Sequence, residues 1–244
     1  MESSKESKLS IIIPVFNEEE CVDSLLAELK GTLTKYKILY EIVIVNDDST
    51  DSTLLKVKKH VDQDSKIFLI NNPERRGLGR CLRFGFENSI GDIIVVVMGD
   101  HADNINDIPV MLNKIIHDGF DFVCASRYMK DGEAKQNNFL KGRISKFLGR
   151  ITNFIWKVPT LDSTNAYKMF RRELLNNIGP LKSKYYTLGF ELVIKSYFKG
   201  FKITEIPTIW KERISGNSHF KCLREGMEYL QWFLIFMLKY KNKK

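Results

Sequence analysis

Asp100 and Asp103 stand directly after an apolar run at residues 93–98. Six consecutive apolar residues, most of them β-branched, predict a central strand that is buried on both faces. Open α/β sheets bind their ligands at the carboxyl ends of such strands. Two carboxylates three residues apart at that edge predict a site for one Mg²⁺ or Mn²⁺ ion, because these hard cations take oxygen ligands. The alternative is that Asp103 only begins a turn or caps the helix that starts near Ile108.

Polar and charged residues follow other apolar runs in the same way. They are, in chain order, Asn17 and Glu18, Asp47 and Asp48, and Arg127. The runs before them, residues 9–15, 40–45 and 120–125, predict strands, and segments with helical spacing of apolar residues separate them. Alternating strands and helices predict a mostly parallel sheet, in which the carboxyl ends of the strands meet at one edge. We therefore expect these side chains to line one cleft.

Two cationic loops extend the candidate site. The first is Arg76-Gly77-Leu78-Gly79, in which two glycines allow a close backbone approach and arginine can bind a diphosphate through forked hydrogen bonds. The second, residues 211–218, contains Arg213 and Ser218. Both patterns are typical of phosphate-binding loops, although an ordinary solvated turn has the same composition.

Three local signals predict how the first strand and the later loops are built. Pro14 is expected to end the regular pairing of its strand because proline has no backbone N–H. Asn17, followed by three glutamates, is expected to be the N-cap of a helix that carries Val22 and Leu25. The polar segment 129–141 is expected to form a mobile loop over the cleft.

The composition is that of one α/β domain without a zinc or disulfide framework. Of the 244 residues, 43% are hydrophobic and 28% are charged, and no apolar run approaches the ~20 residues that span a bilayer. The four cysteines are widely spaced. Because the chain begins without an apolar signal sequence, we expect a cytoplasmic protein, and the net charge of +8 favours anionic partners. We expect residues 1–8 to be disordered, 9–220 to form the main domain and 221–244 a tail.

Two segments have the pattern of helices that lie on a membrane surface. Residues 144–155 have apolar residues at helical spacing with basic residues beside them, which fits an anionic membrane surface or packing on the sheet equally well. In the tail, nine of the ten residues at 229–238 are apolar and lysines follow. We expect this amphipathic, basic tail to contact a membrane peripherally. The alternative is a helix that docks on the domain or on a second subunit.

With these residues identified, the chain resembles the family 2 glycosyltransferases of the GT-A fold, and within them the dolichyl-phosphate mannosyltransferase-like branch. The matching motifs are Ile13-Pro14-Val15-Phe16-Asn17-Glu18, Asn46-Asp47-Asp48-Ser49-Thr50-Asp51, Arg76-Gly77-Leu78-Gly79, Ser126-Arg127-Tyr128, and Arg213 with Gly216 and Ser218. Where the branch often has Asp-Ala-Asp, this chain has Met98-Gly99-Asp100, and a variant form, Asp-x-Ser-Asp-Asp-Pro, fits Asp100 and Asp103 better. Asn46 and Asp48 also depart from the family's Asp-Asp-Gly-Ser-Thr-Asp turn.

The resemblance implies an inverting transfer of a hexose from a nucleoside diphosphate sugar, of the GDP-mannose or UDP-glucose class, to a polyprenyl phosphate. By the same resemblance, Asp100 and Asp103 would bind the metal on the donor diphosphate, and Arg127 would face the acceptor phosphate. The residues implied in donor binding are Pro14, Phe16, Asn17, Glu18, Asp47, Asp48, Arg76, Gly77, Gly79, Arg213 and Ser218.

Other functions fit parts of the pattern. A sugar hydroxyl of a surface polysaccharide is an alternative acceptor, and Asp162 or Glu191 would then have to act as the general base. A nucleotidyltransferase or a non-catalytic membrane-surface module would use the same carboxylates or the same basic helices. Nucleic-acid binding is disfavoured, since the basic residues are divided among several loops without a recognisable binding motif. A homo-oligomer is left open.

Overall fold

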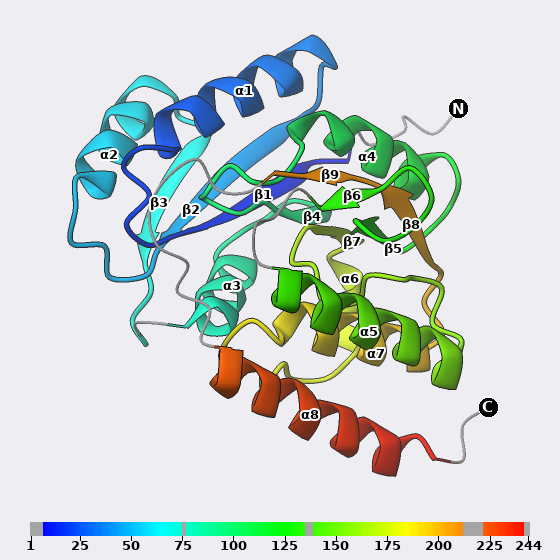
Figure 1. Cartoon of the computed structure of the whole chain (residues 1–244). Helices are drawn as coiled ribbons and strands as arrows, with labels where there is room; N and C mark the ends of the chain where they lie inside the picture. The colour runs from blue at the N-terminus through cyan, green and yellow to red at the C-terminus, as the bar shows by residue number, and fades with distance from the viewer. Residues whose placement is uncertain (1–6, 75–76, 135–138, 212–221, 242–244) are drawn as a thin grey trace.

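The computed structural model describes residues 7–74, 77–134, 139–211 and 222–241. A seven-stranded sheet forms the centre, in the order β3-β2-β1-β4-β7-β5-β8 (Figure 1). The bounds of its strands are β1 Leu9–Val15, β2 Tyr40–Asn46, β3 Ile67–Asn71, β4 Ile93–Val96, β5 Phe122–Ser126, β7 Lys168–Arg171 and β8 Ile203–Pro207. All neighbours pair in parallel except β7, which is antiparallel to both β4 and β5. The predicted mostly parallel α/β sheet is confirmed.

Helices cover both faces of this sheet (Figure 1). On one face lie α1 Val22–Lys35, α2 Thr53–Gln63 and α4 Ile108–Ile116. On the other face lie α3 Leu78–Glu87, α5 Phe139–Trp156, α6 Glu173–Asn177, α7 Leu188–Phe198 and α8 Cys222–Lys239. Apolar side chains of β1, β2 and β4 alternate between the two cores, because successive residues of a strand point to opposite faces.

The pairing of β1 corrects the expectation for Pro14. Its pairing with β2 continues past Pro14 to the Val15–Asn46 pair, whereas its pairing with β4 ends at the Ile12–Val96 pair. The missing N–H of proline therefore affects only one edge of the strand. On that edge, the Pro14 carbonyl oxygen lies so close to Gly99 that a Cβ at Gly99 would be 2.7 Å from it.

The prediction that Asn17 caps the first helix is wrong. α1 begins at Val22, and Asn17 has a left-handed backbone with φ 56°. Its carboxamide oxygen instead accepts a hydrogen bond from the Thr50 backbone N–H at 2.8 Å. Because asparagine tolerates the left-handed region better than most residues, this position reverses the chain after β1 rather than starting the helix.

The polar segment after β5 holds more regular structure than a loop. β6 Glu133–Ala134 pairs in parallel with β9 Ile209–Trp210, and α5 follows the segment. A 3-10 helix, Ile105–Asp107, precedes α4.

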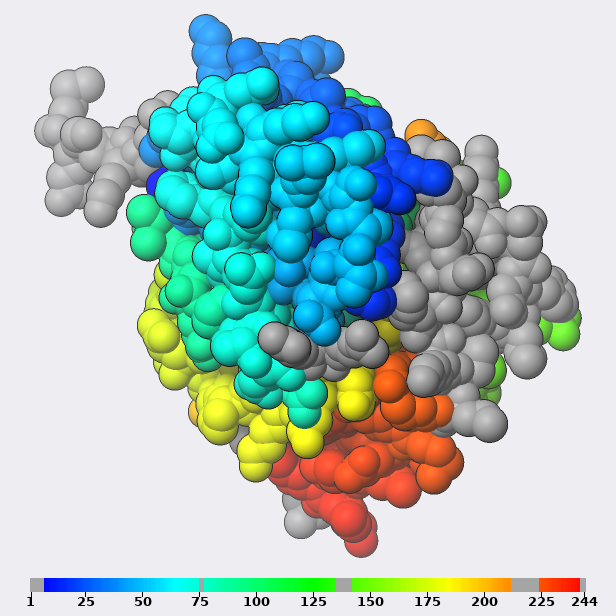
Figure 2. Space-filling model, turned by 90° about the vertical axis from the view of Figure 1, so that its left-hand side faces the viewer, coloured from blue at the N-terminus to red at the C-terminus, as the bar shows by residue number. Residues whose placement is uncertain are grey.

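The C-terminal helix α8 packs on the domain through one face. Tyr229, Phe236 and Tyr240 are buried in the same core cluster as α7. Figure 2 shows α8 in orange and red against the yellow part of the chain, and the Tyr229 hydroxyl donates to the Tyr186 carbonyl oxygen at 3.2 Å. Among the residues that the structure covers, no helix combines the length and the hydropathy needed to cross a membrane.

Candidate active site

The predicted site residues follow four strands that point in the same direction. β1 pairs in parallel with β2 and β4, and β5 has the same direction because β7 is antiparallel to both β4 and β5. The carboxyl ends of these strands therefore lie at one edge of the sheet. The residues that follow them there are Asn17 and Glu18, Asp47 and Asp48, Asp100 and Asp103, and Arg127.

The loops after β1 and β2 form one hydrogen-bonded unit. The Asn17 carboxamide oxygen accepts from the Thr50 N–H, and the Glu18 N–H donates to the Thr53 hydroxyl at 2.8 Å. In the same way, the Glu19 carboxylate accepts from the Ser52 N–H at 2.9 Å. These contacts give the two loops a fixed relative position before any ligand is bound.

The Asp47 carboxylate accepts hydrogen bonds from other parts of the protein. Only 8% of the residue is exposed, and its carboxylate accepts from the Asn72 side-chain N–H and from the Gly77 backbone N–H, both at 2.7 Å. Asp47 thus ties the end of β2 to the segment after β3 and to the start of α3. Sequence reasoning assigned it to the nucleoside, and the structure adds this internal contact with Gly77.

Asp48 adopts a left-handed backbone, with φ 72°. This conformation costs an L-residue about 1 kcal/mol and costs glycine almost nothing. We therefore expect Asp48→Gly to raise the midpoint of thermal unfolding by a few degrees while weakening nucleotide-sugar binding. Calorimetric titration and thermal melts of the same variant check both effects. An increase in stability with unchanged donor affinity would show that Asp48 does not have the donor contact that the resemblance implies.

The two glycines of the basic loop make their close approach to protein backbone. A Cβ on Gly79 would be 2.4 Å from the Ser183 carbonyl oxygen, and one on Gly77 would be 2.6 Å from the Lys184 carbonyl oxygen. The Gly79 N–H also donates to the Lys184 carbonyl oxygen at 3.0 Å. Both glycines are therefore required for the packing of α3 on residues 183–184. Arg76, Arg213 and Ser218 lie outside the described residues.

Asp103 has an unused carboxylate oxygen. The residue is 5% exposed, its Oδ2 accepts from the Met98 N–H at 2.9 Å, and its Oδ1 is buried without a hydrogen-bond partner among the described residues. The pKa of Asp103 is raised to about 7, chiefly by burial and also by the charge of Asp100, against the lowering effects of the Met98 hydrogen bond and of Arg127. The helix-capping alternative is not supported, because Asp107, not Asp103, precedes α4.

The donor set around Asp100 and Asp103 fits a divalent cation. The Asp100 Oδ1 accepts from the Ala102 N–H at 3.2 Å, which turns the loop back toward Asp103. Within the described ranges, no group of three or more His, Cys, Asp and Glu residues is arranged to hold a metal. A site with two carboxylates leaves positions for diphosphate oxygens and water, as is usual for Mg²⁺ sites in phosphate chemistry.

Arg127 is bound to Asp162 by a forked ion pair. Its Nε donates to Asp162 Oδ2 at 2.7 Å and its Nη2 donates to Oδ1 at 2.9 Å, and the Arg127 backbone N–H also donates to Oδ2. Nη2 further contacts the hydroxyls of Ser145 and Thr164. Its Nη1 donates to none of the residues that the structure describes. Within the described part of the chain, the guanidinium therefore has two N–H groups that are not used by the protein.

The two carboxylates considered as a general base are both occupied. Asp162 is fully buried, and although burial opposes ionisation, the charge and hydrogen bonds of Arg127 lower its pKa. Glu191 is also fully buried, and it accepts from the N–H groups of Lys182 and Ser183 and pairs with Lys195 at 2.6 Å. Both carboxylates thus have structural roles in the fold.

Sequence reasoning missed a buried lysine beside the Arg127–Asp162 ion pair. Lys168 on β7 is 1% exposed, and its ammonium donates to the Asn165 carbonyl oxygen. Burial lowers its pKa, and Asp162 and Asp103 act in the opposite direction. The only available signal was a lysine within an otherwise apolar predicted strand.

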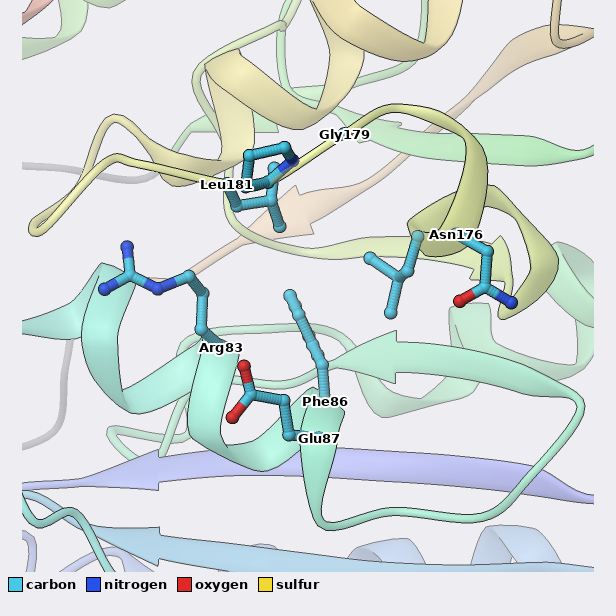
Figure 3. Close-up of a pocket in the computed structure, with 8 residues that line it drawn as sticks. Arg83, Phe86, Glu87, Asn176, Gly179 and Leu181 are labelled. Atoms are coloured by element: carbon cyan, nitrogen blue, oxygen red, sulfur yellow. The ribbon is translucent and has the colours of Figure 1, made fainter.

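A surface pocket of about 430 Å³ lies between α3 and α6 (Figure 3). Phe86 and Leu181 face it from opposite sides, with Arg83 and Glu87 on α3 at its rim. None of the predicted site residues lines this pocket. It is therefore separate from the candidate site at the carboxyl edge of the sheet.

Comparisons with known proteins agree with this geometry. The family model described as "Glycosyl transferase family 2" matches residues 10–179. The chain is 27% identical to dolichol-phosphate mannosyltransferase of Pyrococcus furiosus over 92% of this chain and 64% of that protein. It is 29% identical to an uncharacterized glycosyltransferase of Synechocystis over 72% of this chain and 54% of that protein. The chain thus spans less than two thirds of the length of both relatives.

Solved structures share the fold. Glucosyl-3-phosphoglycerate synthase of Mycobacterium tuberculosis, in complex with Mn²⁺, uridine diphosphate and glucosyl-3-phosphoglycerate, superposes with a TM-score of 0.68. The alignment covers 96% of this chain and 79% of that chain at 17% identity. At this identity, the likeness establishes the architecture and leaves the substrates to be argued from the site.

Proposed function

The chain belongs to glycosyl transferase family 2 and has the GT-A fold, and from this premise we propose that it transfers a hexose from a nucleoside diphosphate sugar to a polyprenyl phosphate with inversion. The observation that carries the proposal is the Asp100–Asp103 pair after β4, in which the buried Oδ1 of Asp103 has no hydrogen-bond partner among the described residues. This pair follows β4, which pairs with β1. The loop after β1 is in turn hydrogen-bonded to the loop after β2.

The donor half of the site is assigned to those joined loops. Asn17, Glu18 and Asp48 would contact the nucleoside, with Pro14 and Phe16 in the same segment and Asp47 holding the start of α3 in place. The basic loop at Gly77 and Gly79, with Arg76, would lie near the diphosphate, and so would Arg213 and Ser218. A sugar of the mannose or glucose class is proposed, with GDP or UDP as the leaving group.

Asp100 and Asp103 would hold Mg²⁺ or Mn²⁺ on the donor diphosphate. The Mn²⁺ and uridine diphosphate present with the Mycobacterium tuberculosis enzyme support this class of cofactor. When bound, the cation supplies charge stabilisation for the departing nucleoside diphosphate. The contribution of this chain is to keep the two carboxylates on one short loop, through the Met98 and Ala102 N–H groups.

The charge of a phosphate monoester supports it as the proposed acceptor. A phosphate monoester, with a second pKa near ~6, is largely dianionic at pH 7, so its oxygen can attack without a protein base. Asp162 and Glu191, the carboxylates considered for that role, are buried and paired. The Nη1 of Arg127, which donates to none of the described residues, would orient an acceptor phosphate. The name of the Pyrococcus furiosus relative also supports a lipid phosphate acceptor.

The test is a pair of assays on purified protein. Thermal shifts with GDP-mannose, UDP-glucose and related donors, with and without Mn²⁺, identify the donor. Transfer of the labelled sugar is then measured to polyprenyl phosphate and to free sugar hydroxyls. Product on polyprenyl phosphate supports the proposal, and product on a sugar hydroxyl alone would replace it with the polysaccharide alternative.

We also propose that α8 and α5 bind an anionic membrane surface, so that the protein associates with the membrane peripherally. The face of α8 opposite its buried side is apolar, with Met227, Leu230, Leu234 and Leu238 each at least half exposed. α5 lies beside α8, since the ring centroids of Trp156 and Phe233 are 5.1 Å apart. Along α5, and at the residue that follows it, cations and aromatic rings alternate on an exposed ridge. Its members are Arg143, Phe147, Arg150, Phe154 and Lys157. This alternation suits anionic headgroups.

Deleting the tail would expose the core, so the test uses surface substitutions. Because two charges would enter the apolar stripe, we expect Leu230→Glu with Leu234→Glu to reduce co-sedimentation with anionic vesicles roughly tenfold or more. Leu55→Glu on α2, where the leucine is 60% exposed, is the matched control and should bind like the wild type. Unchanged binding of the double variant would show that the stripe serves another purpose.

A further inference from the structure

The loop that carries both candidate metal ligands contains a backbone position of high energy. His101, between Asp100 and Ala102, has φ 57°, in the left-handed region. Its backbone N–H donates to the Met98 carbonyl oxygen at 3.3 Å, which closes a turn over Gly99 and Asp100. A non-glycine residue stays in this region only where its surroundings hold it there.

The His101 side chain supplies that hold by binding α1. Its Nε2 lies 2.6 Å from the Glu28 Oε2 and its Nδ1 lies 3.1 Å from the Ser24 hydroxyl. The ring side chain is 14% exposed, whereas the Glu28 side chain is 40% exposed. The imidazole therefore connects the loop after β4 to the adjacent helix.

The two ring nitrogens meet partners on successive turns of α1. The Ser24 hydroxyl, which is 3.1 Å from Nδ1, also lies 2.9 Å from the Cys21 carbonyl oxygen. The two contacts thus fix the orientation of the ring from both sides, and the Cys21 N–H in turn donates to the Glu18 carbonyl oxygen at 3.0 Å. The same short chain of contacts reaches the donor loop.

We propose that His101 is a positioning residue for the metal site, which it orders by anchoring the Asp100–Asp103 loop to Glu28 and Ser24 on α1. The inference rests on the proposed function, since it assigns a role toward the cation that Asp100 and Asp103 would bind. The geometry gives the reason: the two candidate ligands flank the strained residue, and both of its side-chain hydrogen bonds to described residues are to α1. Without the anchor, the loop would relax away from the left-handed turn and the two carboxylates would no longer be held together.

The experiment uses a matched pair of variants on α1. Glu28→Ala removes the partner of His101, and Asp23→Ala removes a carboxylate from the same helix that pairs with His60 on α2 at 2.9 Å. The measurement is direct Mn²⁺ binding by electron paramagnetic resonance, in the presence of saturating UDP or GDP. Neither substituted residue belongs to the site, and both are replaced by a good helix former.

We expect Glu28→Ala to weaken Mn²⁺ binding about tenfold or more, which is typical when a contact that orients a metal ligand is lost. Asp23→Ala should bind Mn²⁺ like the wild type, with a comparable change in thermal stability. His101→Asn, which tolerates the same backbone but cannot reach Glu28, should weaken binding as Glu28→Ala does.

Three results would overturn the inference. If wild type and Glu28→Ala bind Mn²⁺ equally, or if Asp23→Ala weakens binding by the same factor, the contact serves only the stability of the fold. If the wild-type protein binds no Mn²⁺ with either nucleotide, the proposed metal site fails and this inference fails with it. The wild-type control therefore distinguishes the two failures.

Discussion

Asp100→Asn is expected to reduce sugar transfer by roughly 100- to 1000-fold, the range found when one charge-stabilising group is removed from an active site. Asp100 follows a buried strand and contributes a charged oxygen rather than packing, so the fold should persist. Asp103→Asn should cause a loss of similar size. Its Oδ1 has no hydrogen-bond partner among the described residues, so this oxygen is not used by the rest of the described protein.

The measurements are initial rates over a range of Mn²⁺ concentrations, with urea unfolding of each variant alongside. Asp107→Asn is the control from the adjoining 3-10 helix, because the Asp107 carboxylate accepts from the Asn104 side chain and the Thr208 hydroxyl and is not among the residues assigned to the site. We expect it to keep most of the activity. Near-wild-type transfer by Asp100→Asn in saturating Mn²⁺ would contradict the metal assignment.

The framework of the fold could be predicted because it depends on local patterns. Continuous apolar runs in β1, β2 and β4 identify strands that are buried on both faces, and the intervening helices impose parallel pairing. The edge at which site residues gather follows from that pairing alone. Antiparallel β7 could not be foreseen, since its direction depends on a long connection from α5 rather than on its own residues.

The contacts that fix the site could not be predicted because their partners are far apart in the sequence. His101 meets Glu28 across 73 residues, and Arg127 meets Asp162 across 35. A composition pattern does not indicate which of several carboxylates such a cation will meet. Gly79 illustrates the same limit: the pattern indicated a close approach, but only the folded chain identifies Ser183 as the neighbour.

The second large effect is expected at the Arg127–Asp162 ion pair. Removing either charge leaves the other in a site where the Arg127 side chain is 12% exposed and the Asp162 side chain is fully buried. Breaking a buried pair in this way costs about 3–5 kcal/mol. We therefore expect Asp162→Asn and Arg127→Ala each to lower the free energy of unfolding by about this amount, as measured by urea denaturation. The double variant should lose less than the sum, because the two residues contact each other.

This stability effect changes how an activity loss is interpreted. Inactive Asp162→Asn would not identify a general base, because the variant also releases Arg127 from its fork. Transfer must be measured where unfolding data show the variant to be folded. Under conditions where Asp162→Asn is folded, we expect substantial transfer to polyprenyl phosphate, because the dianionic acceptor needs no base. Complete loss in the folded variant, with transfer to a sugar hydroxyl in the wild type, would favour Asp162 as a base instead.

Arg127→Lys separates the structural role of Arg127 from its proposed contact with the acceptor. A lysine keeps the positive charge beside Asp162, but its single ammonium group cannot bind Asp162 in a fork and also offer a further pair of N–H groups to a phosphate. We expect this variant to keep most of the stability that Arg127→Ala loses, and to bind the nucleotide sugar with unchanged affinity. Its KM for polyprenyl phosphate should rise tenfold or more, since a charge-assisted hydrogen bond contributes roughly 1.5–3 kcal/mol. An unchanged KM would assign Arg127 to the fold alone, and the acceptor phosphate would then have to bind another cation at this edge of the sheet.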